Sequence, residues 1–202
     1  MKIGITGGIG TGKSYVCRLL KQRGIEVYDC DEAAKRLIRT SPIIYKGLCQ
    51  LIGPDAFLCQ TDKDEHTLNK AAVTRFLLQS DTHAQAINDI VHPAVFRDFE
   101  AWKAERPDCA LVAFESAILL DRGLPEGFAD YVIYVDAPEE LRLRRAMERD
   151  GSAAESVRRR MQSQKAGPEH PAVDFVLDNS GDFKALEAAL DGVLRQIASE
   201  KL

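Results

Sequence analysis

The sequence contains no run of about eighteen apolar residues, the length that a helix needs to cross a bilayer. Its first residues resemble a short strand rather than a basic stretch followed by an apolar one, so we expect neither a membrane span nor a signal peptide. The five cysteines include no C-x-x-C pair, which argues against a zinc site, and their odd number argues against a secreted disulfide framework. We therefore expect a cytoplasmic protein whose cysteines act as small buried hydrophobic side chains.

The sequence also lacks the composition of a disordered or nucleic-acid-binding chain. Hydrophobic residues make up 45% of its 202 residues and charged residues 29%, which is typical of a globular protein. Acidic residues outnumber basic ones, 31 against 27, so we expect no binding to nucleic acid. There is no internal repeat, no low-complexity tract and no linker rich in proline or serine. We therefore expect one domain that carries insertions, and a monomer.

Strand and helix patterns alternate at the start of the chain. Residues 2–6 form an apolar strand pattern, a helix pattern follows a glycine cluster, and residues 25–28 form a second strand pattern. Strand, helix and strand over about thirty residues make a βαβ unit, which implies a parallel sheet. Further strands are predicted at 110–114, 131–135 and 174–177, and a last helix at 183–199. The sequence predicts an α/β fold with a five-stranded parallel sheet flanked by helices.

A mostly helical stretch separates the second and third predicted strands, with helices expected at 43–52, 67–79 and 84–104. A parallel crossover needs only about a dozen residues, so we interpret residues 39–105 as an insertion that grips a substrate at the strand ends. The core of the fold is then assigned to 1–38, 106–141 and 171–202, and a lid to 142–170. His92-Pro93 lies inside the stretch predicted to be helical over 84–104. Either the proline marks a helix boundary and the histidine is incidental, or the histidine is functional.

The lid segment differs from the rest of the chain in charge. Residues 142–165 carry eight basic groups against three acidic ones. An exposed helix usually mixes charges, so this excess favours a basic flap that closes over a polyanion. Arg142, Arg145 and Arg149 share one face of the predicted helix. One of them could stabilise the charge on a transferring phosphoryl group; the alternative is pairing with nearby glutamates at the surface.

A glycine-rich motif carries the clearest chemistry. Gly7 through Ser14 fit the pattern G-x-x-x-x-G-K-[ST], between a predicted strand and a predicted helix. Glycines let successive backbone N–H groups turn toward phosphate oxygens, and the helix that begins near Lys13 adds its positive dipole end. We expect Lys13 to reach the β- and γ-phosphates and the Ser14 hydroxyl to bind Mg²⁺. The motif therefore predicts a site for a nucleoside triphosphate.

Transfer of a phosphate to an alcohol also requires a carboxylate that takes the hydroxyl proton. Ligands of an open α/β sheet bind at the carboxyl ends of its strands, and Asp29 and Asp31 follow the second predicted strand. If strand alternation continues, the two aspartates share a side, so their spacing does not choose between them. Either could instead cap a helix that begins near Glu32.

Five segments, taken in order, resemble the dephospho-CoA kinase family, and the resemblance covers nearly the whole chain. They are the strand end and glycine loop Thr6–Ser14, the strand end and helix start Val27–Lys35, the tripeptide Val91-His92-Pro93, the lid stretch Leu143–Asp150, and the segment Val173–Gly181. The glycine loop alone is shared with a very large class of proteins. The five segments together are specific to this family.

The resemblance implies a P-loop fold and an activity. The γ-phosphate of ATP, bound with Mg²⁺ at Ser14, would move to the ribose 3′-hydroxyl of dephospho-CoA and give coenzyme A and ADP. Asp31 would act as the base, and Arg145 would be the lid arginine near ATP, with Arg142 and Arg149 in the same lid. His92 and Lys70 would contact the acceptor. The ATP-binding residues would be Gly8, Gly10, Thr11, Gly12, Lys13, Ser14 and Tyr15.

The chain departs from the family pattern at several positions. Tyr15 replaces the usual threonine, although a contact through its backbone N–H survives that change. Lys35 and Lys70 stand where arginine is common; lysine keeps the charge but loses the two-pronged hydrogen bonding of a guanidinium. After the third strand, Ser116-Ala117-Ile118-Leu119-Leu120-Asp121 replaces a Pro-Leu-Leu-x-Glu pattern. The last difference affects the shape of the acceptor pocket rather than the phosphate chemistry.

Two other functions fit parts of the sequence. Another P-loop kinase for a small molecule or a nucleotide would use the same loop, insertion and basic segment, and only the family resemblance separates it. A nucleotide-dependent switch would bind partners rather than phosphorylate a metabolite. The chain has no N-K-x-D guanine motif, because Asn179-Ser180-Gly181-Asp182 lacks the lysine. Such a switch would also need neither an acceptor-binding insertion nor Asp31.

Overall fold

The structure is a computed structural model, and it describes residues 1–58, 66–80, 82–121, 125–164 and 166–200. The chain divides into two compact units. The sheet unit comprises Met1–Tyr28 and Asp108–Leu202, and the helical unit comprises Asp29–Pro107. Among the described residues, no helix combines the length and the apolar character needed to cross a bilayer.

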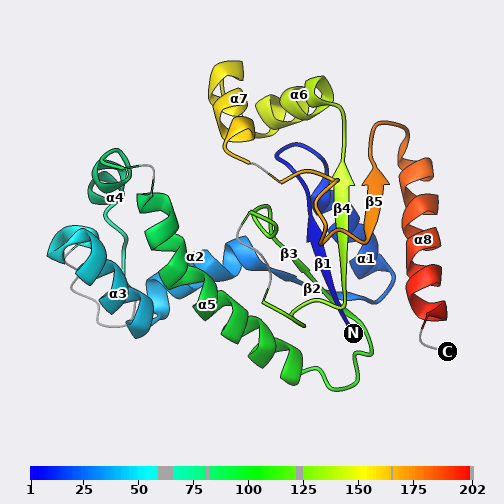
Figure 1. The fold of residues 1–202 in the computed structure, drawn as a ribbon, viewed down its shortest axis with the longest axis horizontal. Coiled ribbons are helices and arrows are strands. Elements are labelled where there is room, and N and C mark those ends of the chain that lie inside the picture. Colours follow the sequence, from blue (N-terminus) through cyan, green and yellow to red (C-terminus); the bar gives the residue numbers. More distant parts are fainter. Residues whose placement is uncertain (59–65, 81, 122–124, 165, 201–202) are drawn as a thin grey trace. The chain divides into compact units, whose positions relative to one another are not determined.

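Five strands form one sheet in the order β2-β3-β1-β4-β5 (Figure 1). They are β1 (Lys2–Thr6), β2 (Glu26–Asp29), β3 (Val112–Glu115), β4 (Tyr131–Asp136) and β5 (Phe175–Asp178). The β1–β3, β1–β4 and β4–β5 pairs are parallel, and Ile3 at the centre pairs with Ala113 on one side and Tyr131 on the other. The predicted fold class is confirmed, and each strand lies within a residue or two of its predicted range.

Helices α1 (Lys13–Gln22) and α8 (Phe183–Ser199) pack on one face of this sheet (Figure 1). Side chains alternate along a strand, so Ile3 and Ile5 point to this face and Gly4 to the other. Apolar residues of both helices meet those of β1, β4 and β5 in one buried cluster, which includes Ile3, Ile5, Val16, Leu20, Ile133, Val135, Leu177, Leu186, Leu190 and Ile197. This packing fixes the start of α1 beside the carboxyl end of β1.

The other face of the sheet is packed closely at Gly4, where a Cβ atom would collide with the Leu119 side chain. The Phe114 and Phe128 rings meet edge to face, with 5.1 Å between their centroids. The absence of a side chain at Gly4 therefore lets the segment after β3 approach β1.

Two helices follow β4 and form the segment expected to be a lid. Helix α6 (Glu139–Asp150) and helix α7 (Ala154–Gln162) share a small buried cluster of Leu143, Ala146 and Val157. Ile9 of the glycine loop packs against the same cluster. This pair of basic helices therefore contacts the glycine loop through an apolar side chain as well as through charges.

The helical unit contains α2 (Cys30–Thr40), α3 (Pro42–Ile52), the 3₁₀ helix η1 (Pro54–Ala56), α4 (Lys70–Leu77) and α5 (His83–Ala104). Helix α5 packs against α2 and α3, and it buries Val91, Val95 and Phe99. The three helices predicted within the insertion correspond to α3, α4 and α5.

Pro93 lies inside α5, which confirms the helix predicted over 84–104, and the alternative of a helix boundary at His92-Pro93 is wrong. Proline removes one backbone donor and crowds the preceding turn, which favours a break. Val91 and Ala94 are buried on either side of it, and Val95 and Phe99 continue the buried face. Tertiary packing therefore holds the helix through the proline.

The cysteines only partly follow the expectation of burial. Cys17 and Cys30 are buried, which confirms it. Cys49 and Cys109 are partly exposed, which corrects it, and Cys59 lies outside the described residues. None of the four described cysteines forms a disulfide.

Candidate active site

The glycine loop connects β1 to α1 and is built on left-handed backbone conformations. Gly10 has φ 79° and Gly12 has φ 98°, values that side-chain-bearing residues rarely adopt. A Cβ atom at Gly10 would collide with the Arg142 backbone of α6, and one at Gly12 would collide with the Asn179 side chain. Glycine is therefore required here both for backbone shape and for the close approach of two other segments.

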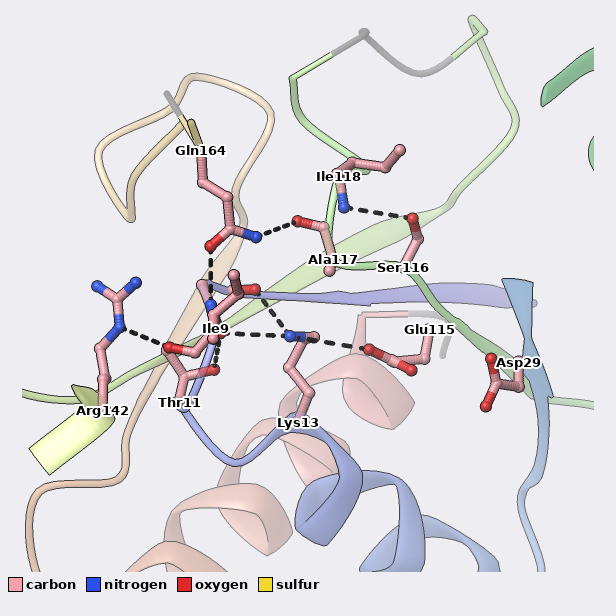
Figure 2. Close-up of polar contacts among 12 residues, drawn as sticks. Ile9, Thr11, Lys13, Asp29, Glu115, Ser116, Ala117, Ile118, Arg142 and Gln164 are labelled. Carbon is pink, nitrogen blue, oxygen red and sulfur yellow. Dashed lines mark hydrogen bonds and ion pairs between the residues drawn. The ribbon is translucent and has the colours of Figure 1, made fainter. Parts of the chain in front are cut away.

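Lys13 extends back across its own loop (Figure 2). Its ammonium donates hydrogen bonds to the carbonyl oxygens of Gly7, at 2.9 Å, and Gly8, at 3.3 Å. The Glu115 carboxylate lies 3.9 Å from the same nitrogen. Both side chains are largely buried, so the positive charge is held close to the backbone that the motif assigns to the phosphates.

Sequence reasoning missed Glu115, although its position could have revealed it. Glu115 ends β3, and Asp136 ends β4, on either side of the central strand β1. The rule that singled out Asp29 and Asp31, carboxylates at the carboxyl ends of parallel strands, applies equally to these two residues.

The peptide group of Ile9 is held at both of its polar atoms (Figure 2). Its N–H donates to Oε1 of Gln164, at 2.8 Å, and its carbonyl accepts from Nε of Arg142, at 3.1 Å. Sequence reasoning assigned Arg142 to a lid and missed Gln164, because an isolated glutamine carries no local pattern. Arg142 and Gln164 both follow β4 in the chain, yet both bind Ile9 in the glycine loop.

Arg145 occupies a half-buried position beside the end of β5, where it donates to the carbonyl of Asn179 at 3.2 Å. Burial lowers the pKa of this guanidinium from its usual value, and repulsion from Arg144 lowers it further. Among the described residues, no carboxylate lies within ion-pair distance of Arg145. A desolvated cation without a carboxylate is stabilised by any anion that binds beside it.

Asn179 is a further residue that sequence reasoning did not assign to the site. Its side chain is 3% exposed and donates from Nδ2 to the carbonyl of Thr11 at 2.7 Å. Its backbone N–H donates to the carbonyl of Asp136 at 2.7 Å. The residue therefore ties the ends of β4 and β5 to the glycine loop.

Arg149, predicted to share a face with Arg142 and Arg145, is committed to a different partner. Asp150 accepts hydrogen bonds from Arg149, at 2.7 Å, and from Arg160, at 2.8 Å. These two guanidiniums hold the pKa of the Asp150 carboxyl well below its ordinary value of 3.8. A lowered carboxyl pKa stabilises the fold above that ordinary value, and the stabilisation is lost as pH falls below it. Part of the basic excess is thus neutralised within α6 and α7.

Ser14 is exposed at the start of α1, directly after Lys13. Tyr15, the residue that departs from the family pattern, turns toward α8 instead. Its hydroxyl donates to Glu187 at 2.9 Å, and its ring lies 4.8 Å from that of Phe183. The hydrogen bond to Glu187 raises the pKa of Tyr15. The Tyr15 side chain is therefore taken up by structural contacts, and its backbone N–H donates to the carbonyl of Gly12 at 2.9 Å.

In the helical unit, the structure separates Asp29 from Asp31. Strand β2 ends at Asp29 and α2 begins at Cys30, so the strand alternation assumed for the two aspartates does not continue to Asp31. The Asp29 side chain caps α2 by accepting from the Glu32 N–H at 2.9 Å. Asp31 lies exposed in the first turn of the same helix. The helix begins two residues earlier than expected, and Asp29 is its cap.

The other predicted acceptor residues lie on two helices of this unit. Lys70 is exposed at the start of α4, and His92 lies within α5, with its ring 6.3 Å from that of Phe96. Lys35 forms a 2.6 Å ion pair with Glu32 on the surface of α2. That hydrogen bond raises the pKa of the Lys35 ammonium.

Comparison with known proteins gives a consistent result. A model of the family described as dephospho-CoA kinase matches residues 1–185. A Porphyromonas gingivalis protein named dephospho-CoA kinase is 42% identical over 179 residues, which cover 85% of each chain. A Bacteroides fragilis protein of the same name is 39% identical over 192 residues, covering 95% of this chain and 90% of that protein. A crystal structure from Thermus thermophilus, 33% identical, superposes with a TM-score of 0.78 and covers 97% of each chain.

The close contact at Gly12 makes a testable prediction. Gly12→Ala should weaken ATP binding about tenfold or more, because the methyl group would displace Asn179 and strain the loop. Gly24→Ala is the matched control: Gly24 also has a positive φ, 76°, but nothing lies within 4 Å of its Cβ position. Titration calorimetry with ATP measures both variants. If Gly12→Ala binds ATP as tightly as Gly24→Ala does, the close approach of Asn179 to Gly12 is not required for ATP binding.

Proposed function

This chain belongs to the dephospho-CoA kinase family, and we propose that Lys13, Arg145 and Asp31 carry its reaction in the roles set out below. The reaction transfers the γ-phosphate of ATP to dephospho-CoA and gives coenzyme A and ADP. The observation that carries the residue roles is the phosphate-binding loop, where carbonyl oxygens of the loop hold Lys13 and Arg142. The carbonyl of Asn179, whose side chain binds the same loop, holds Arg145. The family match over residues 1–185 favours this function over another P-loop kinase.

Lys13 and the start of α1 hold the triphosphate. The helix dipole and the loop N–H groups attract the phosphates, and Lys13 exchanges its contacts with the carbonyls of Gly7 and Gly8 for phosphate oxygens. Carbonyl oxygens are weaker partners for an ammonium than phosphate oxygens are, because the latter carry charge. The exchange therefore favours binding without a large change in the loop.

Mg²⁺ fits the oxygen donors beside this loop. Ser14 offers an exposed hydroxyl and Glu115 a carboxylate, and both are hard oxygen ligands of the kind that Mg²⁺ prefers. Among the described residues, no group of three or more histidine, cysteine, aspartate or glutamate side chains forms a metal cage. That agrees with an ion bound by one or two protein oxygens together with the phosphates of ATP. When bound, Mg²⁺ would neutralise charge on the phosphates.

Asp31 is the general base in this proposal, acting on the ribose 3′-hydroxyl of dephospho-CoA. Asp29 is less suited to the role, because one of its carboxylate oxygens already accepts from the Glu32 N–H as the cap of α2. If Asp29 took the proton of the substrate hydroxyl, that role would also compete with its role as the cap. The exposed position of Asp31 in the first helical turn leaves its carboxylate accessible to solvent and substrate.

Arg145 and Arg142 neutralise the charge that develops during transfer. Both are half-buried, and each donates to a backbone carbonyl rather than to a carboxylate. The remaining N–H groups of both arginines can bind a phosphate without breaking an ion pair. Arg149 supports them indirectly, through the Asp150 contact that links α6 to Arg160 of α7.

We further propose the functional division of the chain. Residues 39–105 form the acceptor-binding insertion, in which Lys70 and His92 contact the substrate, and 142–170 form the lid over ATP. The bounds of the two compact units in the chain and the packing of α6 on α7 support this division. The excess of acidic over basic residues supports a role without nucleic acid, and four described cysteines without disulfides support a cytoplasmic setting. The proposed functional form is a monomer.

An acceptor panel tests the function. ADP release from Mg-ATP is measured with dephospho-CoA, adenosine, AMP, shikimate or no acceptor, and the product is identified by mass. We expect turnover with dephospho-CoA and a product with the mass of coenzyme A. Turnover with another acceptor alone would retain a P-loop kinase and reject this substrate. Slow release that no acceptor stimulates would favour a nucleotide-dependent switch.

The base assignment predicts a difference between two aspartates. Asp31→Asn should lower kcat about 100-fold or more, because an amide cannot take the hydroxyl proton, while both substrates still bind. Asp29→Asn is the matched control, since asparagine caps a helix as well as aspartate does. Steady-state kinetics on both variants decide the assignment. If Asp31→Asn retains kcat and Asp29→Asn loses it, Asp29 is the base.

The role of Arg145 predicts a split between rate and affinity. Arg145→Ala should lower kcat by about 100-fold while changing ATP affinity less, because the charge it meets is greatest in the transition state. Arg144→Ala, one residue away and exposed, should stay within about twofold of the unmodified enzyme in both constants. Loss of affinity with an unchanged kcat would make Arg145 a binding residue only.

A further inference from the structure

The segment that follows α7 binds two loops of the sheet unit at once. Gln164 accepts from the Ile9 N–H at 2.8 Å and donates from Nε2 to the carbonyl of Ala117 at 3.2 Å (Figure 2). Two residues later, the Ala166 N–H donates to Asp121 at 3.0 Å. The segment therefore connects the phosphate-binding loop with the segment that follows β3.

The two contacts of Gln164 use both ends of its amide. The oxygen can only accept and the amino group can only donate, and each meets the complementary backbone group. The side chain is half-buried, so losing either contact would leave a backbone group of Ile9 or Ala117 without its partner in a poorly solvated place. A primary amide on this side-chain length satisfies both contacts.

The Ile9 end of this bridge acts on the phosphate-binding loop. Arg142 holds the carbonyl of the same residue, and the Ile9 side chain packs against Leu143, Ala146 and Val157. Gln164 supplies the remaining contact, on the N–H. The orientation of this peptide plane therefore depends on Gln164 on one side and Arg142 on the other.

The Ala117 end of the bridge acts on the end of β3. Ala117 lies two residues after Glu115, whose carboxylate is 3.9 Å from the Lys13 ammonium. Residues of both loops, among them Gly8, Ala117 and Gln164, line a cavity of about 10 Å³, which is close to the space of one water molecule. With so little free space, a shift of one loop is transmitted to the other.

We propose that Gln164 is a positioning residue for phosphoryl transfer, which sets the separation between the phosphate-binding loop and the end of β3 and so aligns Lys13 with Glu115. It touches neither substrate, and its effect passes through Ile9 and Ala117. This inference deepens the proposed function and rests on it. Misplacement of reacting groups by about 1 Å can reduce a rate about 100-fold, so a small displacement of these loops has a measurable effect.

Two variants separate the contacts of Gln164. Gln164→Met keeps the length of the side chain and removes both hydrogen bonds. Gln164→Glu keeps an oxygen for the Ile9 N–H but replaces the donor to Ala117 with an acceptor. Gln162→Met, at the exposed end of α7, is the matched control. For each variant, kcat and both KM values are measured, and kcat is normalised to the number of ADP-binding sites found by titration.

We expect both Gln164 variants to lower the normalised kcat tenfold or more, with KM for ATP and for dephospho-CoA within about threefold of the control. A normalised kcat within about twofold of Gln162→Met in either variant would overturn the proposal. So would loss of ADP binding or of folded protein in both variants, since Gln164 would then be a structural residue only. Absence of dephospho-CoA phosphorylation by the unmodified enzyme would instead refute the proposed function, and the two failures are therefore distinguishable.

Discussion

The hydrogen bonds at the Ile9 peptide are the constraint on which the phosphate-binding side of the enzyme depends. A loop with glycine at four of its first six positions, 7 to 12, has many accessible backbone conformations, and each must be restricted before the loop can hold a ligand. Gln164 and Arg142 fix the N–H and the carbonyl of Ile9, and Asn179 fixes the carbonyl of Thr11. In the proposed function, ATP therefore meets a loop that is already ordered, so its binding free energy is not reduced by the ordering of that loop.

The parts of the fold that could be predicted from the sequence are those with local signals. Strand β1, the glycine loop, α1 and α8 were predicted almost to the residue, because an apolar period and a glycine motif are readable within short windows. The end of β2 shows the limit of such reasoning. Strand alternation predicts that Asp31 shares a side with Asp29. In the structure, Asp29 accepts from the Glu32 N–H as the cap of α2, which begins at the next residue. A cap and a catalytic carboxylate are the same residue type, so only the position of the helix start separates them.

Other features could not be predicted, because their partners are distant in the chain. Gln164 and Ile9 are 155 positions apart, and Asn179 and Thr11 are 168 apart. The sequence around a glutamine or an asparagine contains no local pattern that predicts a hydrogen bond to a residue so distant in the chain. Pro93 lies inside a helix for a related reason. Proline locally favours a helix boundary, but the packing of buried residues on both sides of it outweighs that preference. Glu115 differs from these, because the strand-end rule would have identified it.

The distribution of charge around the glycine loop explains why this site would favour a triphosphate. In α6 and α7, Asp150 neutralises Arg149 and Arg160, whereas Arg142 and Arg145 donate only to carbonyl groups among the described residues. A carbonyl dipole satisfies hydrogen bonding but does not cancel a net charge, and burial of Arg145 lowers its pKa as a consequence. An anion beside Arg142 and Arg145 would stabilise their positive charge and so replace the solvation by water that they lost on folding. The same desolvation would strengthen their interaction with charge that develops in the transition state, so the groups proposed to favour ATP binding are also those suited to phosphoryl transfer.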